Sequence, residues 1–315
     1  MIAKTGYQPN LVAKNLRTKK SNSIGVLVED ILAFPTSRII NGISEYMEST
    51  DYHILLNDLR MLESLYDKYN QIIHQKDKII KQLLYLIHAA KVDAVIYVGM
   101  FDRDVSGIIP NINKPVTIVY STSEDAHTSF VTYENKDIST QMMRYLIDAG
   151  HRHIVVISGP IHTSPTQLRL EGIRKAFDEA GLTFDNSSVK AGDWGRDSGY
   201  HCIKEILKLK NKKLPTAIFA MNDFMAIGAM DAIREAGLRV PEDISVTGFD
   251  NRSVSDLVFP KLTTVEIDLK SVGFTAAQMT AEKLAGSGRY MQERKIIIPS
   301  KMIFRNSVCE NILYR

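Results

Sequence analysis

Eight short runs of apolar residues recur along the chain from Ile24 onward, and each is five or six residues long. Valine and isoleucine follow one another in these runs with little polar alternation. Such runs are typical of parallel strands that are covered on both faces, so each run is predicted to be a strand. The runs are IGVLV (24–28), YHILLN (52–57), DAVIYV (93–98), PVTIVY (115–120), HIVVIS (153–158), TAIFA (216–220), ISVTGF (244–249) and TTVEI (263–267).

Amphipathic stretches lie between several of these runs and predict helices over 135–149, 166–180, 197–210 and 223–236. Several of them end in a glycine that stops a helix, as in DAGH and EAGL. The repeated alternation of strand and helix predicts a doubly wound parallel α/β sheet, or two of them. The number of units favours two similar lobes over one very wide sheet.

One helical stretch is predicted to be unusually long. Apolar residues from Leu62 to Leu86 follow alternating three- and four-residue steps, and neither glycine nor proline occurs between Leu62 and Val92. We therefore expect a helix of about 27 residues, broken in its pattern only by Lys76. Its extra length serves either packing within the lobe or an exposed surface for a partner.

The composition is that of an ordinary globular protein, with 44% hydrophobic and 24% charged residues in 315. No apolar run approaches the roughly 20 residues of a membrane span, and the first ten residues have no apolar core typical of a secretion signal. Cys202 and Cys309 stand far apart, so neither a disulfide framework nor a zinc site is expected. We expect a cytoplasmic protein without a membrane partner.

The charge is distributed unevenly. Residues 1–20 contain five lysines and arginines and no acid, whereas the whole chain has a net charge of +3, so the rest carries −2. A basic segment of this kind either binds a polyanion or is a solvated tail.

Motifs of enzyme chemistry are not found. The sequence has no GxGxxG after a strand, no GxxxxGK[ST], no HExxH and no GxSxG, and its eight histidines show no metal-binding spacing. The sequence therefore nominates no catalytic residue, no cofactor and no metal ligand.

The stretch GYQPNLVAKNLRTKKSNSIGVLVED, from Gly6 to Asp30, resembles the junction between DNA-binding and effector-binding parts in the lactose/galactose repressor family. Further resemblance lies in SGPIHTSPTQLRLEGIRKAF, GDWGRDSGY, TAIFAMNDFMAIGAM, GLRVPEDISVTGFDN and PKLTTVEIDL, in the family's order and spacing. The resemblance implies the type I periplasmic-binding-protein fold, with two Rossmann-like parallel-sheet lobes, a three-strand crossover hinge and a ligand in the cleft.

The implied domains are a remnant of the DNA-binding domain with a hinge helix at 1–20, and an effector-binding domain at 21–315. The N-terminal lobe is expected at about 21–135 and 268–298, and the C-terminal lobe at about 136–267 and 299–315. In this family roughly 45 residues of helix-turn-helix precede the hinge helix, whereas Met1–Tyr7 precede it here. A shortened chain or a misassigned start is therefore expected.

The hinge helix is predicted after Pro9, with Asn10 as its N-cap. Such a short helix is unstable alone, so we expect it to fold against DNA and its symmetry mate. Leu16 matches the family's minor-groove wedge, and the alternative is an ordinary contact with a protein neighbour. Basic side chains beside it suit phosphates. The DNA and hinge residues are Asn10, Ala13, Lys14, Leu16, Arg17 and Lys19.

By the same resemblance, four residues of the C-terminal lobe bind effector. Arg169 in QLRLEG donates to ligand hydroxyls, Asn222 in MNDF and Asp250 in GFDN complete polar recognition, and Trp194 offers an aromatic platform. The alternatives are a surface charge for Arg169 and helix caps for Asn222 and Asp250.

The other lobe departs from the family pattern. Phe34 precedes Pro35 in EDILAFPTSRI, which alters the aromatic wall, while Ser121 and Ser123 occupy positions that can contact ligand. Ile267 stands where some sugar-binding members have a polar residue. The effector is expected to be a sugar or sugar derivative, with a nucleobase or another small polar metabolite as the next choice.

The sequence thus predicts the effector-binding core and hinge of a homodimeric transcription regulator, a repressor that binds operator DNA when full length. The alternative is a solute-binding protein of the same fold for transport or chemotaxis, which the basic hinge and the missing signal disfavour. An enzyme would need a catalytic pair that the sequence does not nominate.

Overall fold

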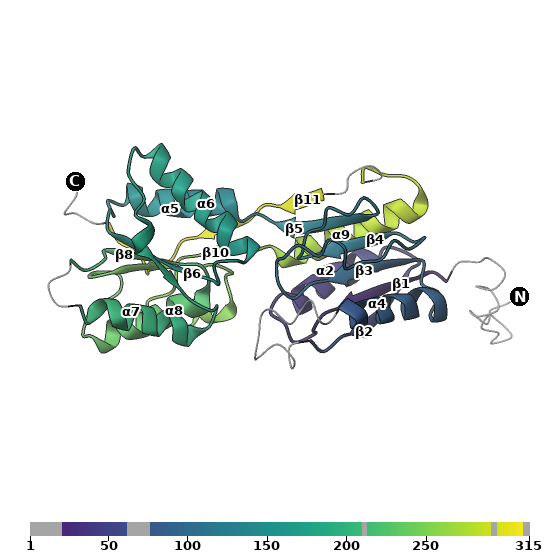
Figure 1. Cartoon of the computed structure of the whole chain (residues 1–315), viewed down its shortest axis with the longest axis horizontal. Helices are drawn as coiled ribbons and strands as arrows, with labels where there is room; N and C mark the ends of the chain where they lie inside the picture. The colour runs from purple at the N-terminus through teal and green to yellow at the C-terminus, as the bar shows by residue number, and fades with distance from the viewer. Residues whose placement is uncertain (1–20, 62–75, 210–212, 291–294, 311–315) are drawn as a thin grey trace, which may run out of the picture. The chain divides into compact units, whose positions relative to one another are not determined.

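The computed structural model describes residues 21–61, 76–209, 213–290 and 295–310. It divides the chain into two compact units, which are described one at a time (Figure 1). The N-terminal unit comprises Met1–Thr132 and Leu269–Ile298, and the C-terminal unit comprises Tyr133–Asp268 and Pro299–Arg315.

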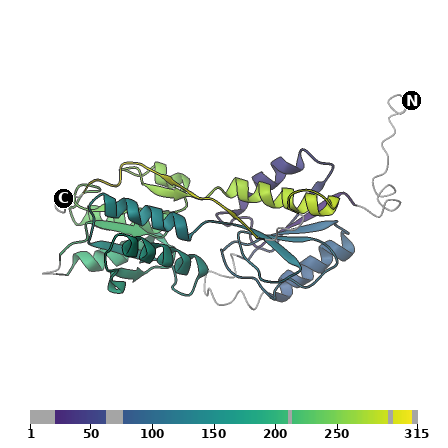
Figure 2. The ribbon, with the colours of Figure 1, turned by 90° about the horizontal axis from the view of Figure 1, so that it is seen from above.

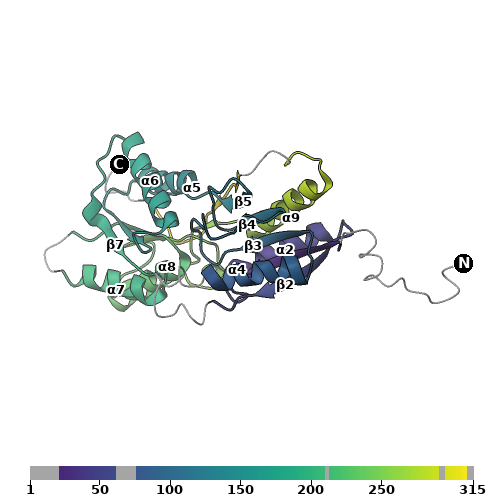
Figure 3. The same ribbon diagram turned by 45° about the vertical axis from the view of Figure 1, so that its right-hand side comes forward.

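The N-terminal unit is built on a six-stranded sheet in the order β11-β5-β4-β3-β1-β2. The five strands from β5 to β2 run parallel to their neighbours, and Figure 3 shows β5, β4 and β3 side by side. The strands are β1 (Ser23–Val28), β2 (His53–Asp58), β3 (Ala94–Val98), β4 (Val116–Val119), β5 (Thr128–Tyr133) and β11 (Lys295–Ile298).

Helices cover both faces of this sheet. In Figure 2, α2 (Thr36–Met47) and α9 (Leu269–Ala285) lie on one face and α4 (Lys76–Leu84) lies on the other. Strands β1, β3 and β4 are almost entirely buried because both of their faces are covered. This burial explains why their sequences read as uninterrupted apolar runs.

The C-terminal unit has a four-stranded parallel sheet in the order β7-β6-β8-β9. Helices α5 and α6 lie on one face, and α7 and α8 lie on the other (Figure 1). A separate antiparallel pair joins β10 to β12. The strands are β6 (Ile154–Ser158), β7 (Val189–Ala191), β8 (Ala217–Ala220), β9 (Ser245–Thr247), β10 (Thr264–Glu266) and β12 (Lys301–Ile303). The helices are α5 (Lys136–Asp148), α6 (Ser164–Glu179), α7 (Arg196–Leu207) and α8 (Asp223–Glu235), with short 3₁₀ turns η4 (Asn186–Ser188) and η5 (Ser253–Asp256).

The predicted doubly wound parallel architecture is confirmed, and all eight predicted strands are present within two residues of the expected bounds. The four helices predicted in the C-terminal half are present too. The apolar runs did not predict β5, β7, β11 and β12, nor did the amphipathic pattern predict α2 and α9. Strands β7 and β12 have only three residues each and are partly exposed, so they carry no apolar run.

The long predicted helix is only partly open to comparison, because residues 62–75 lie outside the described part of the chain. The described half is helical, as α4 followed by a π-helical turn at Tyr85–Ala89. Ile79, Leu83 and Leu86 are fully buried, so the apolar stripe faces the core of the N-terminal unit. The π turn was not predicted. Among the described residues, no helix combines the length and apolar character of a membrane span.

Two helix pairs pack with their backbones in direct contact, through reciprocal glycines. A Cβ on Gly42 of α2 would overlap the carbonyl oxygen of Lys270 on α9, and a Cβ on Gly273 of α9 would overlap that of Ile39. Gly199 of α7 and Gly228 of α8 make the same kind of contact in the C-terminal unit. The glycines therefore let the helices approach more closely than any larger residue allows.

We predict that Gly42→Ala destabilises the N-terminal unit by about 1–3 kcal/mol, although alanine is the better helix former. The added methyl group must push α9 away, because the atom it meets belongs to the backbone. Urea unfolding followed by circular dichroism measures the effect. Arg38→Ala, at an exposed position of the same helix, is the control and should change the free energy of unfolding by less than about 0.5 kcal/mol. An alanine variant as stable as the wild type would show that the helices have room to adjust.

Candidate functional site

The carboxyl edge of the sheet in the C-terminal unit brings four predicted residues together. Asn222 comes two residues after β8, Asp250 comes three residues after β9, and Arg169 reaches the same edge from α6. The guanidinium carbon of Arg169 lies 5.7 Å from the ring centroid of Trp194. This edge is where open α/β sheets bind ligands, so we regard it as the candidate functional site.

Arg169 is a buried arginine, with 2% of its surface exposed, and not a surface charge. Its Nε donates to Asn135 Oδ1 at 2.9 Å, its Nη2 donates to the Tyr133 hydroxyl at 3.3 Å, and its Nη1 donates to the Met221 carbonyl. The guanidinium carbon lies 3.5 Å from the ring centroid of Phe249, a close cation–π contact. These partners fix the direction of the guanidinium group. Its removal would therefore cost stability as well as any ligand contact.

Asn222 acts as the N-cap of α8, the alternative role that the sequence left open. Its Oδ1 accepts from the Met225 N–H at 2.8 Å, and its Nδ2 donates to the Trp194 carbonyl at 2.8 Å. The side chain is 3% exposed. The amide thus joins the start of α8 to the loop that carries Trp194, and a ligand would have to share these donors and acceptors.

Trp194 is held by the backbone around it. It has a φ of +72°, a left-handed conformation that is uncommon for a bulky residue. Its ring lies so close to Gly159, which follows β6, that a Cβ on Gly159 would overlap the ring carbons. The half-buried indole is therefore fixed in position against the end of β6, as a platform for a ligand ring would require.

Asp250 lies in a strained turn and pairs with Arg252. Its φ is +105° and its side chain is buried, with Oδ2 3.2 Å from Nε of Arg252. Burial raises the pKa of Asp250 above its ordinary value, while the guanidinium groups of Arg252 and Arg169 act in the opposite direction. No described contact makes it a helix cap, so the structure does not support that alternative reading for this residue.

A second buried acid, Asp223, was missed by the sequence analysis. Its Oδ2 accepts from the Arg252 N–H at 2.7 Å and its Oδ1 accepts from the Thr264 hydroxyl at 2.5 Å. Burial, and next the nearby Asp250 carboxylate, raise the pKa of Asp223 to about 7. The signal was its place in MNDF beside Asn222, directly after a buried strand. Asp223 joins the Asp250 turn to α8 and so positions Asp250.

Three predicted residues, Phe34, Ser121 and Ser123, belong to the N-terminal unit. Ser121 is fully buried and its hydroxyl donates to the Phe101 carbonyl at 2.9 Å. The Ser123 hydroxyl accepts from the Thr128 hydroxyl at 3.1 Å, and Phe34 is half-buried. Both serine hydroxyls therefore form hydrogen bonds with neighbouring loop residues of the N-terminal unit.

The same unit contains a buried ion pair that the sequence analysis did not assign. Glu29, the first of two acids that follow β1, is fully buried and accepts from Arg103 Nη1 at 2.9 Å and Nη2 at 2.5 Å. The Met100 N–H and the Tyr97 hydroxyl also donate to this carboxylate. Burial, and next the Glu29 carboxylate, raise the pKa of Tyr97 well above its ordinary value, so the phenol keeps its proton. An acid directly after an apolar strand was the signal in the sequence.

The remaining predicted residues are Ile267 and the DNA and hinge residues. Ile267, which stands where some sugar-binding family members have a polar residue, is 1% exposed. All six DNA and hinge residues, from Asn10 to Lys19, lie outside the described residues. Within the described ranges, no group of three His, Cys, Asp or Glu side chains is placed to hold a metal ion.

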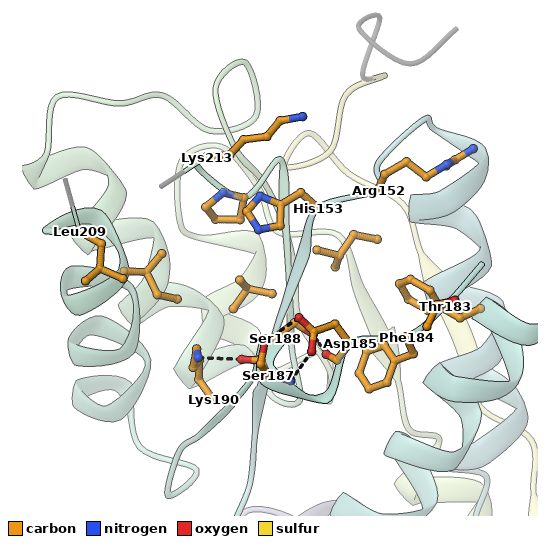
Figure 4. A pocket seen from close by; sticks show the side chains of 15 residues that line it. Arg152, His153, Thr183, Phe184, Asp185, Ser187, Ser188, Lys190, Leu209 and Lys213 are labelled. Carbon is orange, nitrogen blue, oxygen red and sulfur yellow. Dashed lines mark hydrogen bonds between the residues drawn. The ribbon is translucent and has the colours of Figure 1, made fainter. Parts of the chain in front are cut away.

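A recess of about 200 Å³ lies at the opposite, amino edge of the sheet in the C-terminal unit (Figure 4). Ile154 and Val155 at the start of β6 line it, and none of the predicted site residues does. Ser187 spans its rim, with its N–H and hydroxyl bonded to Asp185 at 2.8 and 2.5 Å and its carbonyl to Lys190 at 2.7 Å. These rim groups satisfy one another, and the recess lies at the far end of the strands from Asp250.

Comparison with known proteins gives a family for this chain. Residues 143–308 match the family model of the periplasmic binding protein-like domain. The chain is 30% identical over 311 residues to the HTH-type transcriptional repressor PurR of Pasteurella multocida, covering 98% of this chain and 87% of that protein. It is 27% identical over 311 residues to catabolite control protein A of Priestia megaterium, covering 97% and 87%. A crystal structure of the Lac repressor bound to ONPG in the repressed state superposes with a TM-score of 0.76 at 25% identity, covering 97% of this chain and 88% of that one.

We predict that Asp223→Asn removes a pH-dependent part of the stability of the C-terminal unit. The pKa of Asp223 rises from 3.8 to about 7 on folding, so the folded protein binds the proton more tightly. This carboxyl group therefore stabilises the fold more as the pH falls from about 7 to about 4, by up to about 1.4 kcal/mol per pH unit. The unfolding free energy of the wild type minus that of the variant should therefore fall as the pH rises through this window.

Urea unfolding at a series of pH values measures this difference. Asp148→Asn, at an exposed position near the end of α5, is the control and should give a difference that does not change with pH. A constant difference for Asp223→Asn as well would contradict the buried, proton-holding role of this carboxyl group.

Proposed function

The chain belongs to the lactose/galactose repressor family of ligand-responsive bacterial transcription regulators, and from this premise we propose its effector chemistry, its DNA contact and its assembly. We propose that residues 21–315 form the effector-binding domain, and that Arg169, Asp250, Asn222 and Trp194 bind a small polar effector, a sugar or sugar derivative. Phe34, Ser121 and Ser123 remain predicted contacts.

The buried Arg169–Asp250 arrangement is the observation that carries this proposal. A guanidinium fork donates several N–H groups in one plane, and a carboxylate accepts hydroxyl protons, so together they match vicinal hydroxyl groups. Trp194, fixed against Gly159, adds an aromatic face for a sugar ring. Because Arg169 and Asp250 are buried with fixed partners, little side-chain entropy is lost when a ligand binds.

Binding would regulate by favouring one of two conformations. A ligand shifts a conformational equilibrium only as far as its affinities for the two states differ. The site residues are tied by hydrogen bonds to β8, α8 and the loop of Trp194. A ligand that moves one of them therefore moves whole elements, which is what a regulator needs.

We propose that residues 1–20 contact operator DNA in a protein that acts in the cytoplasm. Five basic side chains and no acid in this segment suit a polyanion, while the rest of the chain is slightly acidic. The same feature disfavours the alternative of a solute-binding protein for transport, which has no use for a basic hinge. An enzyme is not supported, because the relatives PurR and catabolite control protein A are regulators by name.

An exposed apolar patch on the C-terminal unit supports a homodimer. Leu257 is 80% exposed and Phe259 is 87% exposed. Phe259 lines a groove together with Ile227, Met230, Val258, Asp231 and Arg234. Exposed apolar side chains that cluster in this way are typical of a protein–protein interface. A second copy of the chain is the proposed occupant, because paired hinge helices on a symmetric operator require two chains.

We predict that the protein sediments as a dimer at concentrations on the order of ten micromolar and that Phe259→Asp weakens the dimer by about 2 kcal/mol or more. A buried aspartate at the interface would have no partner to offset its desolvation. Analytical ultracentrifugation measures the change. Ile161→Asp, at another exposed apolar position of the same unit, is the control and should leave the dimer intact. A monomeric wild type would contradict the assignment of the patch.

We also predict that residues 1–315 bind DNA weakly, with a steep salt dependence and almost no sequence preference. Phosphate contacts from residues 1–20 release counterions, so the affinity should fall by about a hundredfold between 50 and 200 mM salt. Fluorescence anisotropy with promoter and random duplexes measures both properties. The triple variant Lys14→Gln, Arg17→Gln, Lys19→Gln should flatten the salt dependence. Discrimination of the promoter from random DNA by about a hundredfold would place base recognition in the hinge and contradict this prediction.

A further inference from the structure

We propose that Asp93 is a positioning residue for DNA binding. Its carboxylate holds Ser21 and Asn22, where the basic segment 1–20 joins the N-terminal unit, and so fixes the junction between the two. This inference rests on the proposed function, because it takes residues 1–20 to contact DNA. It adds a residue far away in the sequence, which the sequence analysis did not nominate, to the residues on which DNA binding depends.

The Asp93 carboxylate accepts hydrogen bonds from the backbone of the entering chain. Asp93 directly precedes β3 and is 6% exposed. Its Oδ2 accepts from the Asn22 N–H at 2.8 Å and from the Ser21 N–H at 3.1 Å, and its Oδ1 lies 3.3 Å from the same Ser21 nitrogen. Hydrogen bonds to a carboxylate are roughly twice as strong as those between neutral groups. Asp93 therefore binds both residues that follow the basic segment.

The entering chain is held from its other side as well. Strand β1 lies between β2 and β3, and the Asn22 carbonyl accepts from the His53 N–H of β2 at 2.8 Å. The Ser21 hydroxyl accepts from the Ser23 N–H at 3.2 Å. Asn22 has a φ of +50°, a left-handed conformation that asparagine adopts more readily than most residues. Ser21, Asn22 and Asp93, which we call the entry anchor, thus form a fixed junction and not a freely rotating one.

A fixed junction favours the binding of DNA by the basic segment. Ordering a flexible joint on binding costs conformational entropy, and an anchor that is ordered beforehand avoids part of this cost. In a dimer, both basic segments must also reach phosphates of one duplex, which depends on the direction in which each segment joins its unit. By its charge alone, a carboxylate beside a basic segment would oppose DNA binding. Geometry and not charge therefore accounts for an acid at this place.

The competing account is that Asp93 only stabilises the fold of the N-terminal unit. Its backbone N–H donates to the Ser23 carbonyl at 2.8 Å, a contact that does not need the side chain. Its carboxylate also lies 3.9 Å from Lys114 Nζ, which is beyond the length of a hydrogen bond. On this account, folded variants of Asp93 would bind DNA as the wild type does, or more tightly because a negative charge is gone.

Asp58 offers a matched control in the same unit. It too is an aspartate that holds two backbone N–H groups, since its Oδ1 accepts from Ile31 at 3.2 Å and from Arg60 at 3.0 Å. Asp58 ends β2, whereas Asp93 precedes β3, and both strands run parallel to β1. The two acids therefore lie at opposite edges of the sheet. Replacing either one by alanine removes the same charge, but only Asp93 contacts the entering chain.

The test measures the binding of residues 1–315 to a random-sequence duplex of roughly 30 base pairs by fluorescence anisotropy, at a temperature at which circular dichroism shows each variant to be folded. We expect Asp93→Ala to lower the DNA affinity about tenfold with an unchanged salt dependence, because the same lysines and arginines meet phosphates. Asp93→Asn keeps one acceptor oxygen and should retain part of the affinity. Asp58→Ala should change the affinity by less than about twofold.

Amide hydrogen exchange followed by mass spectrometry reports on the entry anchor itself. The N–H groups of Ser21 and Asn22 should exchange slowly in the wild type and in Asp58→Ala, because their hydrogen bonds are intact. They should exchange about tenfold faster or more in Asp93→Ala, and at an intermediate rate in Asp93→Asn. Loss of protection together with loss of DNA affinity links the anchor to the DNA contact.

Four results would overturn the proposal. They are a folded Asp93→Ala that binds DNA at least as tightly as the wild type, an equal loss of affinity in Asp58→Ala, fast exchange of Ser21 and Asn22 in the wild type, and, if the alanine variant does not fold, full affinity in Asp93→Asn. A wild type that binds no DNA would refute the DNA contact of residues 1–20 and the positioning role with it. DNA binding that is insensitive to Asp93 would keep that contact and refute the anchor alone.

Discussion

The burial of one charged side chain, Arg169, constrains the carboxyl edge of the C-terminal unit. A buried guanidinium group is tolerated only when its donors are paired, and here the partners come from residues 133–135, from Met221 after β8 and from the ring of Phe249. The segments at 133–135, after β8 and after β9 are therefore tied to the same group. The structural and ligand-binding roles of Arg169 cannot be separated, because the contacts that orient it also hold the edge together.

A comparable arrangement exists in the N-terminal unit, where Glu29 and Arg103 form a buried pair at the carboxyl ends of the strands. In both units, then, the polar groups at this edge have fixed partners before any ligand arrives. Fixed partners reduce the entropy that is lost on binding. The glycine contacts of α2 with α9 and of α7 with α8 add to this rigidity, because a backbone in van der Waals contact cannot be compressed further.

The sequence predicted the fold well because the fold depends on burial, which valine and isoleucine runs report directly. It also indicated the positions of Asn222 and Asp250, since residues after buried strands lie at the ligand-binding edge. Neither their partners nor the roles of Arg252 and Asp223 could be read in the same way. Whether an arginine is a surface charge or a buried fork depends on residues far away in the chain, such as Phe249 for Arg169. The three-residue strands and the π turn after α4 were missed because local pattern carries no signal for them.

The most direct test of the central claim is calorimetry with a library of sugars, sugar acids, sugar phosphates and nucleobases on the wild type and on Arg169→Ala, at a temperature at which both are folded. The account predicts at least one ligand that binds the wild type and loses on the order of 2–4 kcal/mol of binding free energy in the variant, because several charge-assisted hydrogen bonds disappear. Ligands that bind both proteins equally, or a wild type that binds nothing in the library, would contradict it.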